Sequence, residues 1–225
     1  MLHNKTYKKK LINTECWIFD LDNTLYSASC NLFNKIDKKM TAYIAKYLRI
    51  DARKASQIRK SYYRDYGTTM SGMMALHGMK PKDFLDYVHD IELKDIPPNP
   101  ELNKALSRLS GRKIIYTNGT VDHAERVLNQ LSIQHHFDEI FDIISANYIP
   151  KPFPEPYDLI VKKYDIETSK TVMVDDLIRN LVPAADLGMT TVWIRPDQQL
   201  KLGAVNLNKV NYVVDDLTSW LSSLV

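Results

Sequence analysis

The sequence predicts a doubly wound α/β fold, in which a parallel, Rossmann-like sheet carries helices on both faces. One observation is that short apolar runs alternate with helix-length segments along most of the 225 residues. A second is that these runs are continuous and rich in Val and Ile, as strands buried on both faces are. A third is that residues 28–96 interrupt the alternation with helical patterns alone, which predicts an inserted helical module.

The elements can be taken in chain order. The expected strands are residues 16–21, 113–116, 140–144, 171–174, 191–194 and 212–214. Helices are expected between them at 123–131, 156–163 and 180–187, the last stopped by Gly188. In the interruption, apolar residues between Leu32 and Tyr47 follow helical spacing, and further helices are expected at 52–66, 72–77 and 81–91. We therefore expect a basic tail at 1–13, a catalytic body at 14–27 and 97–225, and a helical cap at 28–96.

Composition and charge exclude several classes of protein. Hydrophobic residues make up 44% and charged residues 25%, which is ordinary for a folded domain. No apolar run approaches the roughly 18 residues that span a bilayer, so no membrane partner is expected. The net charge of +3 comes from 30 Lys+Arg against 27 Asp+Glu, and the tail lysines, Lys5, Lys8, Lys9 and Lys10, account for it. A nucleic-acid polymer is therefore not an expected partner.

Cysteine usage bears on the compartment. Only Cys16 and Cys30 occur, without CxxC spacing, and no signal-peptide apolar segment is evident. A reducing, cytoplasmic setting fits best, with the protein as a monomer or small homo-oligomer.

Polar residues follow four of the expected strands. The first is followed by Asp20 and Asp22, the second by Thr117 and Asn118; Lys151 lies beyond the third, and Asp175 and Asp176 follow the fourth. In open α/β sheets, ligands bind at the carboxyl ends of the strands. The sequence therefore predicts one site that joins all of these side chains.

This set of residues has a physical logic. Four acids that converge on one crevice repel each other unless a cation lies among them. A hard, all-oxygen site suits Mg²⁺, which keeps waters and shares a substrate phosphate. An ammonium and a hydroxyl can then hold phosphoryl oxygens, and a carboxylate can attack phosphorus to give an aspartyl phosphate. A second carboxylate, just past the strand end, can act as general acid and then as base for water.

At this point the chain resembles the haloacid dehalogenase-like hydrolase superfamily. Residues 19–26 (FDLDNTLY) are similar to its first motif, and Thr117-Asn118, Lys151 and Asp175-Asp176 match the second, third and fourth in order. The insert resembles that superfamily's C1 cap. Within the superfamily the chain is closest to the pyrimidine 5′-nucleotidases, through Tyr26 and through residues 62–69 (YYRDYGTT), 88–90 (VHD) and 97–102 (PPNPEL). The resemblance covers about residues 14–200.

The resemblance implies a role for each matched residue. Asp20 would be the nucleophile and a Mg²⁺ ligand, and Asp22 the general acid/base, with its backbone carbonyl on the metal. Thr117 would hold a phosphoryl oxygen, and Lys151 would restrain Asp20 and neutralise phosphate charge. Asp176 would bind the metal directly, and Asp175 would lie nearby. Asn118 and Asn180 on the body would be supporting groups. The candidate nucleoside contacts are Tyr26 and, in the cap, Tyr66, Thr68, Thr69 and His77.

The expected activity is thus a Mg²⁺-dependent phosphomonoesterase acting on a small phosphorylated metabolite, with pyrimidine nucleoside 5′-monophosphates as the first candidates. A phosphatase of phosphoglycolate or of a sugar phosphate, and a sugar phosphomutase, share the same four motifs. Asp22 argues against a 2-haloacid dehalogenase, which has no alkoxide to protonate. A phospho-receiver signalling module is a remote alternative. In such a module the paired acids follow the first strand and the phosphorylated Asp lies on a later one, whereas here the phosphorylatable Asp belongs to the first pair and a cap is present. Leu177 departs from the family, which often has Ser or Thr there.

Overall fold

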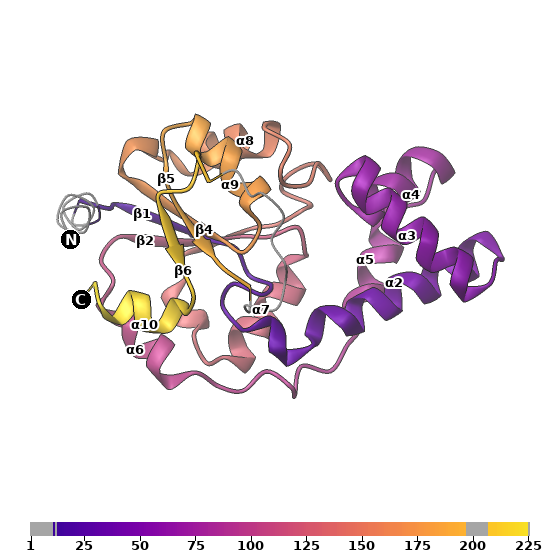
Figure 1. The fold of residues 1–225 in the computed structure, drawn as a ribbon, viewed down its shortest axis with the longest axis horizontal. Helices are drawn as coiled ribbons and strands as arrows, with labels where there is room; N and C mark the ends of the chain where they lie inside the picture. Colours follow the sequence, from indigo (N-terminus) through magenta and orange to yellow (C-terminus); the bar gives the residue numbers. More distant parts are fainter. Residues whose placement is uncertain (1–10, 12, 197–206, 225) are drawn as a thin grey trace.

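A computed structural model describes residue 11, residues 13–196 and residues 207–224. In this part of the chain, six parallel strands form one sheet in the order β3-β2-β1-β4-β5-β6 (Figure 1). This is the strand order of a doubly wound sheet. The order in which strands are added along the sheet reverses between β1 and β4. The fold class predicted from the sequence is confirmed. The strands are β1 (Cys16–Phe19), β2 (Arg112–Tyr116), β3 (Glu139–Phe141), β4 (Thr171–Asp175), β5 (Thr190–Ile194) and β6 (Tyr212–Val214).

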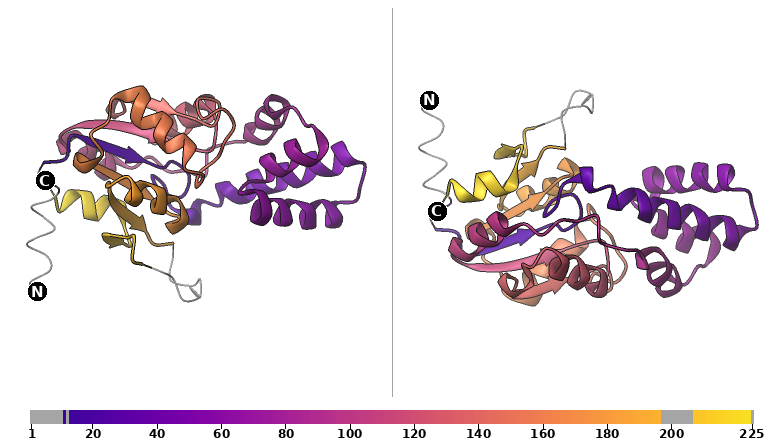
Figure 2. Two further views of the ribbon diagram at one scale, coloured as in Figure 1. Left: turned by 90° about the horizontal axis from the view of Figure 1, so that it is seen from above. Right: turned by 90° about the horizontal axis from the view of Figure 1, so that it is seen from below.

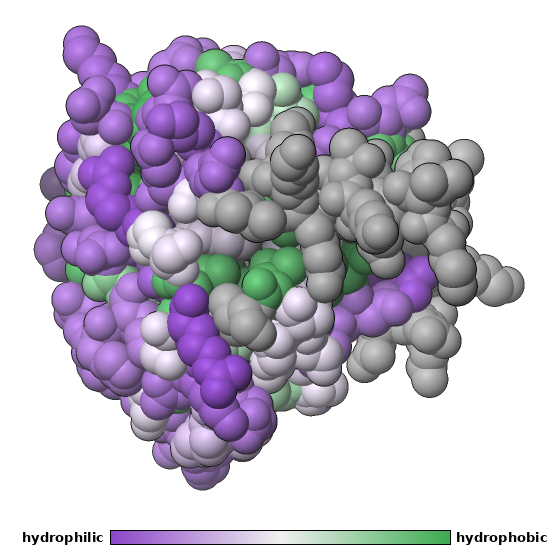
Figure 3. Space-filling view, turned by 90° about the vertical axis from the view of Figure 1, so that its left-hand side faces the viewer, coloured by the Kyte–Doolittle hydropathy of each residue, from purple (hydrophilic) through white to green (hydrophobic). Residues whose placement is uncertain are grey.

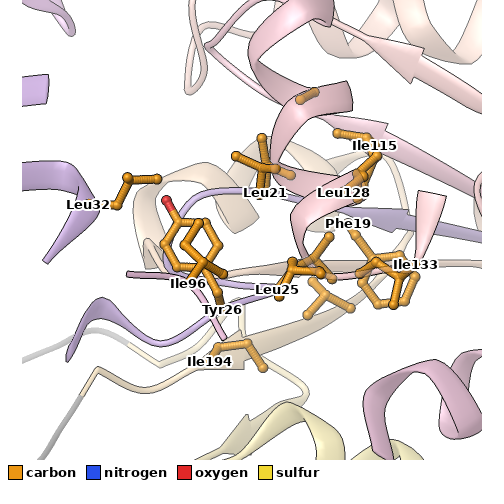
Figure 4. Close-up of a cluster of buried hydrophobic side chains, with 14 of the residues drawn as sticks. Phe19, Leu21, Leu25, Tyr26, Leu32, Ile96, Ile115, Leu128, Ile133 and Ile194 are labelled. Atoms are coloured by element: carbon orange, nitrogen blue, oxygen red, sulfur yellow. The ribbon is translucent and has the colours of Figure 1, made fainter. Parts of the chain in front are cut away.

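Helices cover both faces of the sheet, because alternate residues of each strand point to opposite sides. Trp17 and Phe19 of β1 share a core with α6 (Pro100–Arg108), α7 (Val121–Gln130) and α10 (Leu217–Ser222). Cys16 and Ile18 share the opposite core with α8 (Glu155–Tyr164) and α9 (Ile178–Asp186). Figure 4 shows the first of these cores, where the loop after β1 packs beside α7.

Helices α2 to α5 form a group of their own, which we call the helical insert. They are α2 (Leu32–Leu48), α3 (Ala52–Tyr66), α4 (Thr69–His77) and α5 (Pro81–His89). The group stands beyond the end of β1, away from the two termini (Figures 1 and 2). Side-chain caps begin two of its helices: Asp51 accepts the backbone N–H of Lys54, and Thr68 that of Ser71.

Several features of the body differ from the sequence prediction, including the end of β1 at Phe19 and the unpredicted helix α10, and two of the differences have a clear local cause. Strand β3 ends at Phe141, three residues before the predicted end at 144, because Asp142 turns the chain there by accepting the backbone N–H groups of Val121 and Ser145. Helix α6 was not predicted as a helix. It begins directly after the proline-rich segment, where Asn99 accepts the backbone N–H of Leu102 and Pro100 occupies the first turn.

The face of the body opposite the helical insert is mostly polar. Figure 3 looks onto the end of the body that is opposite the helical insert, and its described residues are mostly hydrophilic. Within the described residues, no helix has the length and apolar character that crossing a membrane requires. The basic tail predicted at 1–13 lies outside the described residues, apart from 11 and 13.

Candidate active site

Asp20 and Lys151 form the buried centre of the site. Asp20 follows β1 directly, and its carboxylate accepts hydrogen bonds from Lys151 Nζ at 2.7 Å and Thr24 Oγ1 at 2.9 Å. Lys151 Nζ also donates to Asp175 Oδ2 at 2.8 Å and to the backbone oxygen of Tyr116 at 2.9 Å. Burial alone would lower the pKa of Lys151, but the two carboxylates outweigh it and raise that pKa. Lys151 is therefore a buried cation that ties the end of β1 to the end of β4.

Asp175 and Asp176 close the other side of this centre. Asp175 is fully buried at the end of β4 and also accepts hydrogen bonds from Asn180 Nδ2 and the backbone N–H of Leu177. Asp176 is half-buried beside it. Burial, together with the charges of Asp20 and Asp175, raises the pKa of Asp176 to about 9. Burial likewise raises the pKa of Asp20 to about 7, against the opposing effect of Lys151.

These three carboxylates make a group that can hold a metal ion. Oxygen atoms of Asp20, Asp175 and Asp176 all lie within 4.8 Å of one another. Three carboxylates and one ammonium leave an excess of two negative charges when all are ionised (−3 + 1 = −2). Burial and then that repulsion raise the pKa values of Asp20 and Asp176, and a divalent cation relieves the repulsion. The donor set contains oxygen only, so it fits a hard cation.

Asp22 lies outside the three-carboxylate group and has partners of its own. Its Oδ1 accepts hydrogen bonds from Tyr26 OH at 2.6 Å and pairs with His123 Nε2 at 3.0 Å. Burial would raise the pKa of Asp22, but the adjacent His123 and the two hydrogen bonds lower it to about 2. The two aspartates of the first motif thus occupy opposite electrostatic environments, which suits two different roles.

The sequence did not predict His123 as a partner of Asp22, because the two residues lie 101 positions apart in the chain. His123 is fully buried in the first turn of α7, and its ring stacks on His89 of α5 at 4.4 Å between centroids. Burial first, and then His123, lower the pKa of His89 to about 3. One signal was available: Thr120 caps α7 just after the second motif, so the first turn of α7 begins at the edge that carries the site.

The second motif forms a tight turn beside this centre. Thr117 is buried, and its Oγ1 accepts the backbone N–H of Gly119 at 2.9 Å. Asn118 joins the turn to Lys151 through a pair of hydrogen bonds: its Oδ1 accepts the Lys151 backbone N–H at 2.8 Å, and its Nδ2 donates to the Lys151 backbone oxygen at 3.3 Å. The ends of β2 and the third motif are thus held together through Asn118.

A cavity of about 320 Å³ opens onto these side chains and extends into the helical insert. Asp20, Asp22, Thr117, Asn118, Lys151, Asp176 and Asn180 line it from the body, and Thr68 and Thr69 line it from the insert. Tyr26 and Tyr66, expected to meet the nucleoside, are not among the lining residues. Tyr26 is buried and donates to Asp22, while the ring of Tyr66 packs edge-on against Tyr62. His77, also outside the lining, contacts Tyr62 OH.

Comparisons with known proteins show the family to which the chain belongs. The family model described as haloacid dehalogenase-like hydrolase matches residues 14–188. Phosphate metabolism protein 8 of Saccharomyces cerevisiae is 26% identical over 191 residues, which cover 77% of this chain and 59% of that protein. Glyceraldehyde 3-phosphate phosphatase of Methanocaldococcus jannaschii is 28% identical over 192 residues, which cover 79% of this chain and 83% of that protein. The chain therefore spans less than two thirds of the length of the yeast relative.

Solved structures show the same fold. The crystal structure of a HAD phosphatase from Thermococcus onnurineus superposes with a TM-score of 0.64 at 19% sequence identity. The match covers 94% of this chain and 98% of the other. The likeness thus extends over the body and the helical insert.

Proposed function

Because this chain belongs to the haloacid dehalogenase-like hydrolase family, we propose that it is a Mg²⁺-dependent phosphomonoesterase whose substrates are pyrimidine nucleoside 5′-monophosphates. The observation that carries the phosphatase chemistry is the buried contact of Lys151 with both Asp20 and Asp175, next to Asp176. It supports a site in which one carboxylate is held in place for attack while the others bind a cation.

In the proposed first step, a carboxylate oxygen of Asp20 attacks phosphorus and the bond from phosphorus to the leaving oxygen breaks. Asp22 gives its proton to the leaving alkoxide, and an aspartyl phosphate remains on Asp20. The pKa of Asp22 is about 2 without substrate, so this step needs a proton on Asp22. The negative charge of an adjacent phosphoryl group favours that protonation.

In the proposed second step, Asp22 takes a proton from water, which attacks phosphorus and releases inorganic phosphate and free Asp20. Asp22 gave up its proton in the first step, so it is ionised and can accept this one. Lys151 and Thr117 would hold phosphoryl oxygens throughout. Asp20, Asp176 and the backbone carbonyl of Asp22 would hold Mg²⁺, with Asp175 close by, and the ion would neutralise charge on the transferred group.

The body and the helical insert would have different roles in this reaction. Residues 14–27 and 97–225 would form the catalytic body, and residues 28–96 a cap that excludes water and selects the leaving group. The lining of the cavity by Thr68 and Thr69 supports a cap role for the insert. Cys16 and Cys30 are both free thiols, which supports the proposed reducing, cytoplasmic setting.

A specific observation favours a second substrate class. The Methanocaldococcus relative, matched over 83% of its length, is named for glyceraldehyde 3-phosphate. A small sugar phosphate or phosphoglycolate would use the same catalytic residues. A sugar phosphomutase would also use them, with transfer to a second substrate in place of water.

Phosphate release from a panel of monoesters, with Mg²⁺ and with EDTA, tests the proposal. The panel contains UMP, CMP, dUMP, dTMP, AMP, GMP, phosphoglycolate, glyceraldehyde 3-phosphate and several sugar phosphates. A preference for the pyrimidine nucleotides that EDTA abolishes is the expected result. Preference for the small phosphates would keep the chemistry and reject the nucleotide assignment. Activity that is unchanged in EDTA would reject the metal.

A further inference from the structure

The cavity has two ends of different chemistry. The catalytic carboxylates and Lys151 lie at the end formed by the body. At the other end the insert contributes mainly apolar side chains, namely Phe33, Ile36, Met40, Met70, Phe84, Leu85 and Val88. Among the lining residues of the insert, two carry a formal charge: Asp37 of α2 and Arg59 of α3. A charged pair among mainly apolar lining residues needs an explanation.

Asp37 and Arg59 contact each other at a single point. Arg59 Nη1 lies 2.5 Å from Asp37 Oδ1, and the two side chains are 16% and 28% exposed. The pair therefore does not use the two parallel hydrogen bonds that a guanidinium and a carboxylate can form. Burial raises the pKa of Asp37, against the opposing effect of Arg59.

Arg59 is also incompletely satisfied. Its Nε is buried and has no hydrogen-bond partner among the described residues. A buried N–H without a partner costs stability, so such groups in folded proteins call for an explanation. Thr69 Oγ1 donates to the backbone oxygen of Arg59 at 3.2 Å, which holds its main chain. The ion pair uses Nη1, and Nη2 makes no hydrogen bond within the described residues, so the guanidinium has a further N–H group to offer where it lines the cavity.

A pyrimidine base matches this end of the cavity. Its flat ring suits the apolar walls, and its edge places a hydrogen-bond acceptor next to a donor. In uracil these are a carbonyl oxygen and the ring N–H; in cytosine they are the ring nitrogen and the amino group. At about 320 Å³ the cavity is at the small end of the range for ligand sites, which favours a one-ring base over a purine.

We propose that Asp37 and Arg59 form the base-recognition subsite, in which Arg59 donates to an acceptor on the base and Asp37 accepts from the adjacent base N–H. The assignment rests on the proposed nucleotidase function and names the residues that give it specificity. Both side chains are 28% exposed or less, so each hydrogen bond to the base would form away from bulk water, where it discriminates strongly.

The alternative is that the pair only braces α2 against α3. The pair also borders a groove on the outer side of these two helices, as a brace would. A brace accounts for the ion pair, and the unpartnered Nε, which is closed to solvent and ligand alike, favours neither explanation. The two explanations differ in outcome: losing a brace impairs all substrates equally, whereas losing a base contact impairs nucleotides selectively.

The test uses the full chain with Mg²⁺ and the variants Asp37→Asn and Arg59→Met, with UMP and p-nitrophenyl phosphate as substrates. We expect kcat/KM for UMP to fall about tenfold to a hundredfold in each variant, and kcat/KM for the aryl phosphate to stay within about threefold. Asp37→Asn keeps the shape of the side chain, and retained aryl phosphatase activity reports that each variant is folded. Arg64→Met is the matched control, because Arg64 lies on the same helix, pairs with Asp65 on the surface and does not line the cavity.

Each outcome decides something. A selective loss on UMP in both variants, with Arg64→Met unchanged, supports the subsite. Equal losses on both substrates, or no loss on UMP, overturn the subsite while the nucleotidase function stands. A wild-type protein that hydrolyses the aryl phosphate but no nucleotide overturns the function and the subsite together.

Discussion

At the scale of single residues, Asp20 and Asp22 differ because of what touches them. Asp20 faces Lys151 and two further carboxylates, while Asp22 faces Tyr26 and His123. Their pKa values, about 7 and about 2, lie on opposite sides of the ordinary value for aspartate. One sequence motif therefore places a carboxylate of the three-carboxylate group and a second carboxylate with a lowered pKa within three residues of chain.

The nucleophile assignment predicts the effect of Asp20→Asn. The amide has the same shape as the carboxylate and can stay next to Lys151, but it cannot form an acyl phosphate. We expect turnover to fall by more than about a thousandfold while the fold is kept. Phosphate release and circular dichroism would check this. Asp86→Asn is the control, since Asp86 is exposed and pairs only with Lys82 among described residues; substantial turnover in Asp20→Asn would remove Asp20 as nucleophile.

His123 predicts a second residue-level effect. Within the described part of the chain, two side chains form hydrogen bonds with Asp22, namely His123 and Tyr26. His123→Ala should lower kcat about tenfold to a hundredfold with little change in KM, because it releases the proton-transfer group and not the phosphate. His123→Gln, which can restore a donor near Asp22, should recover part of the loss. Steady-state kinetics separate the cases, and a change in KM alone would assign His123 to substrate binding.

At the scale of elements, close packing of α3 on α4 limits what the helical insert tolerates. A Cβ added at Gly72 would lie 2.5 Å from both Cβ and Cγ of Tyr62. Alanine favours a helix over glycine by roughly 1 kcal/mol, but the overlap forces the helices apart at a cost of about 1–3 kcal/mol. Gly72→Ala should therefore lower the urea midpoint of unfolding.

Gly78→Ala provides the comparison for this prediction. A Cβ at Gly78 would meet no atom within 4 Å, although its φ of +60° disfavours alanine. Gly78→Ala should thus show backbone strain without overlap. If Gly72→Ala proves no more destabilising than Gly78→Ala, the overlap with Tyr62 is not what limits the packing.

Elements were predictable from sequence where local patterns determine them. The Val- and Ile-rich runs give β4 and β5 within one residue at each end, and the helix predicted at 52–66 matches α3. Strand β3 was predicted too long because the turn depends on Asp142 reaching the backbone of Val121, 21 residues away. The polar residues of the site follow strand ends, so their convergence was predictable. The contacts of Asp22 with His123 and of Asp37 with Arg59 depend on tertiary packing, which no local pattern reveals.

At the scale of the whole molecule, the clustered carboxylates of the site destabilise the folded state when they are ionised and no cation is bound. The carboxylates lie at the ends of β1 and β4, the two strands between which the strand order reverses. Lys151 is the one cation among the described residues that contacts both Asp20 and Asp175. In the folded protein the pKa is about 7 for Asp20 and about 9 for Asp176, against about 3.9 for an unfolded aspartate. Between about pH 4 and pH 9 these two groups therefore bind more protons in the folded protein than in the unfolded chain.

The contribution of Asp20 and Asp176 to the stability of metal-free protein should consequently fall as the pH rises through this window, because their ionisation is easier in the unfolded chain. Asp176→Asn removes the group with the higher pKa. We expect its Tm in EDTA to exceed that of the wild type by a few degrees at pH 8 and by less at pH 5. Addition of Mg²⁺ at pH 8 should raise the wild-type Tm and leave that of Asp176→Asn nearly unchanged. Calorimetry at both pH values measures this, and a Tm difference that is independent of pH and of Mg²⁺ would mean that Asp176 acts through packing rather than charge.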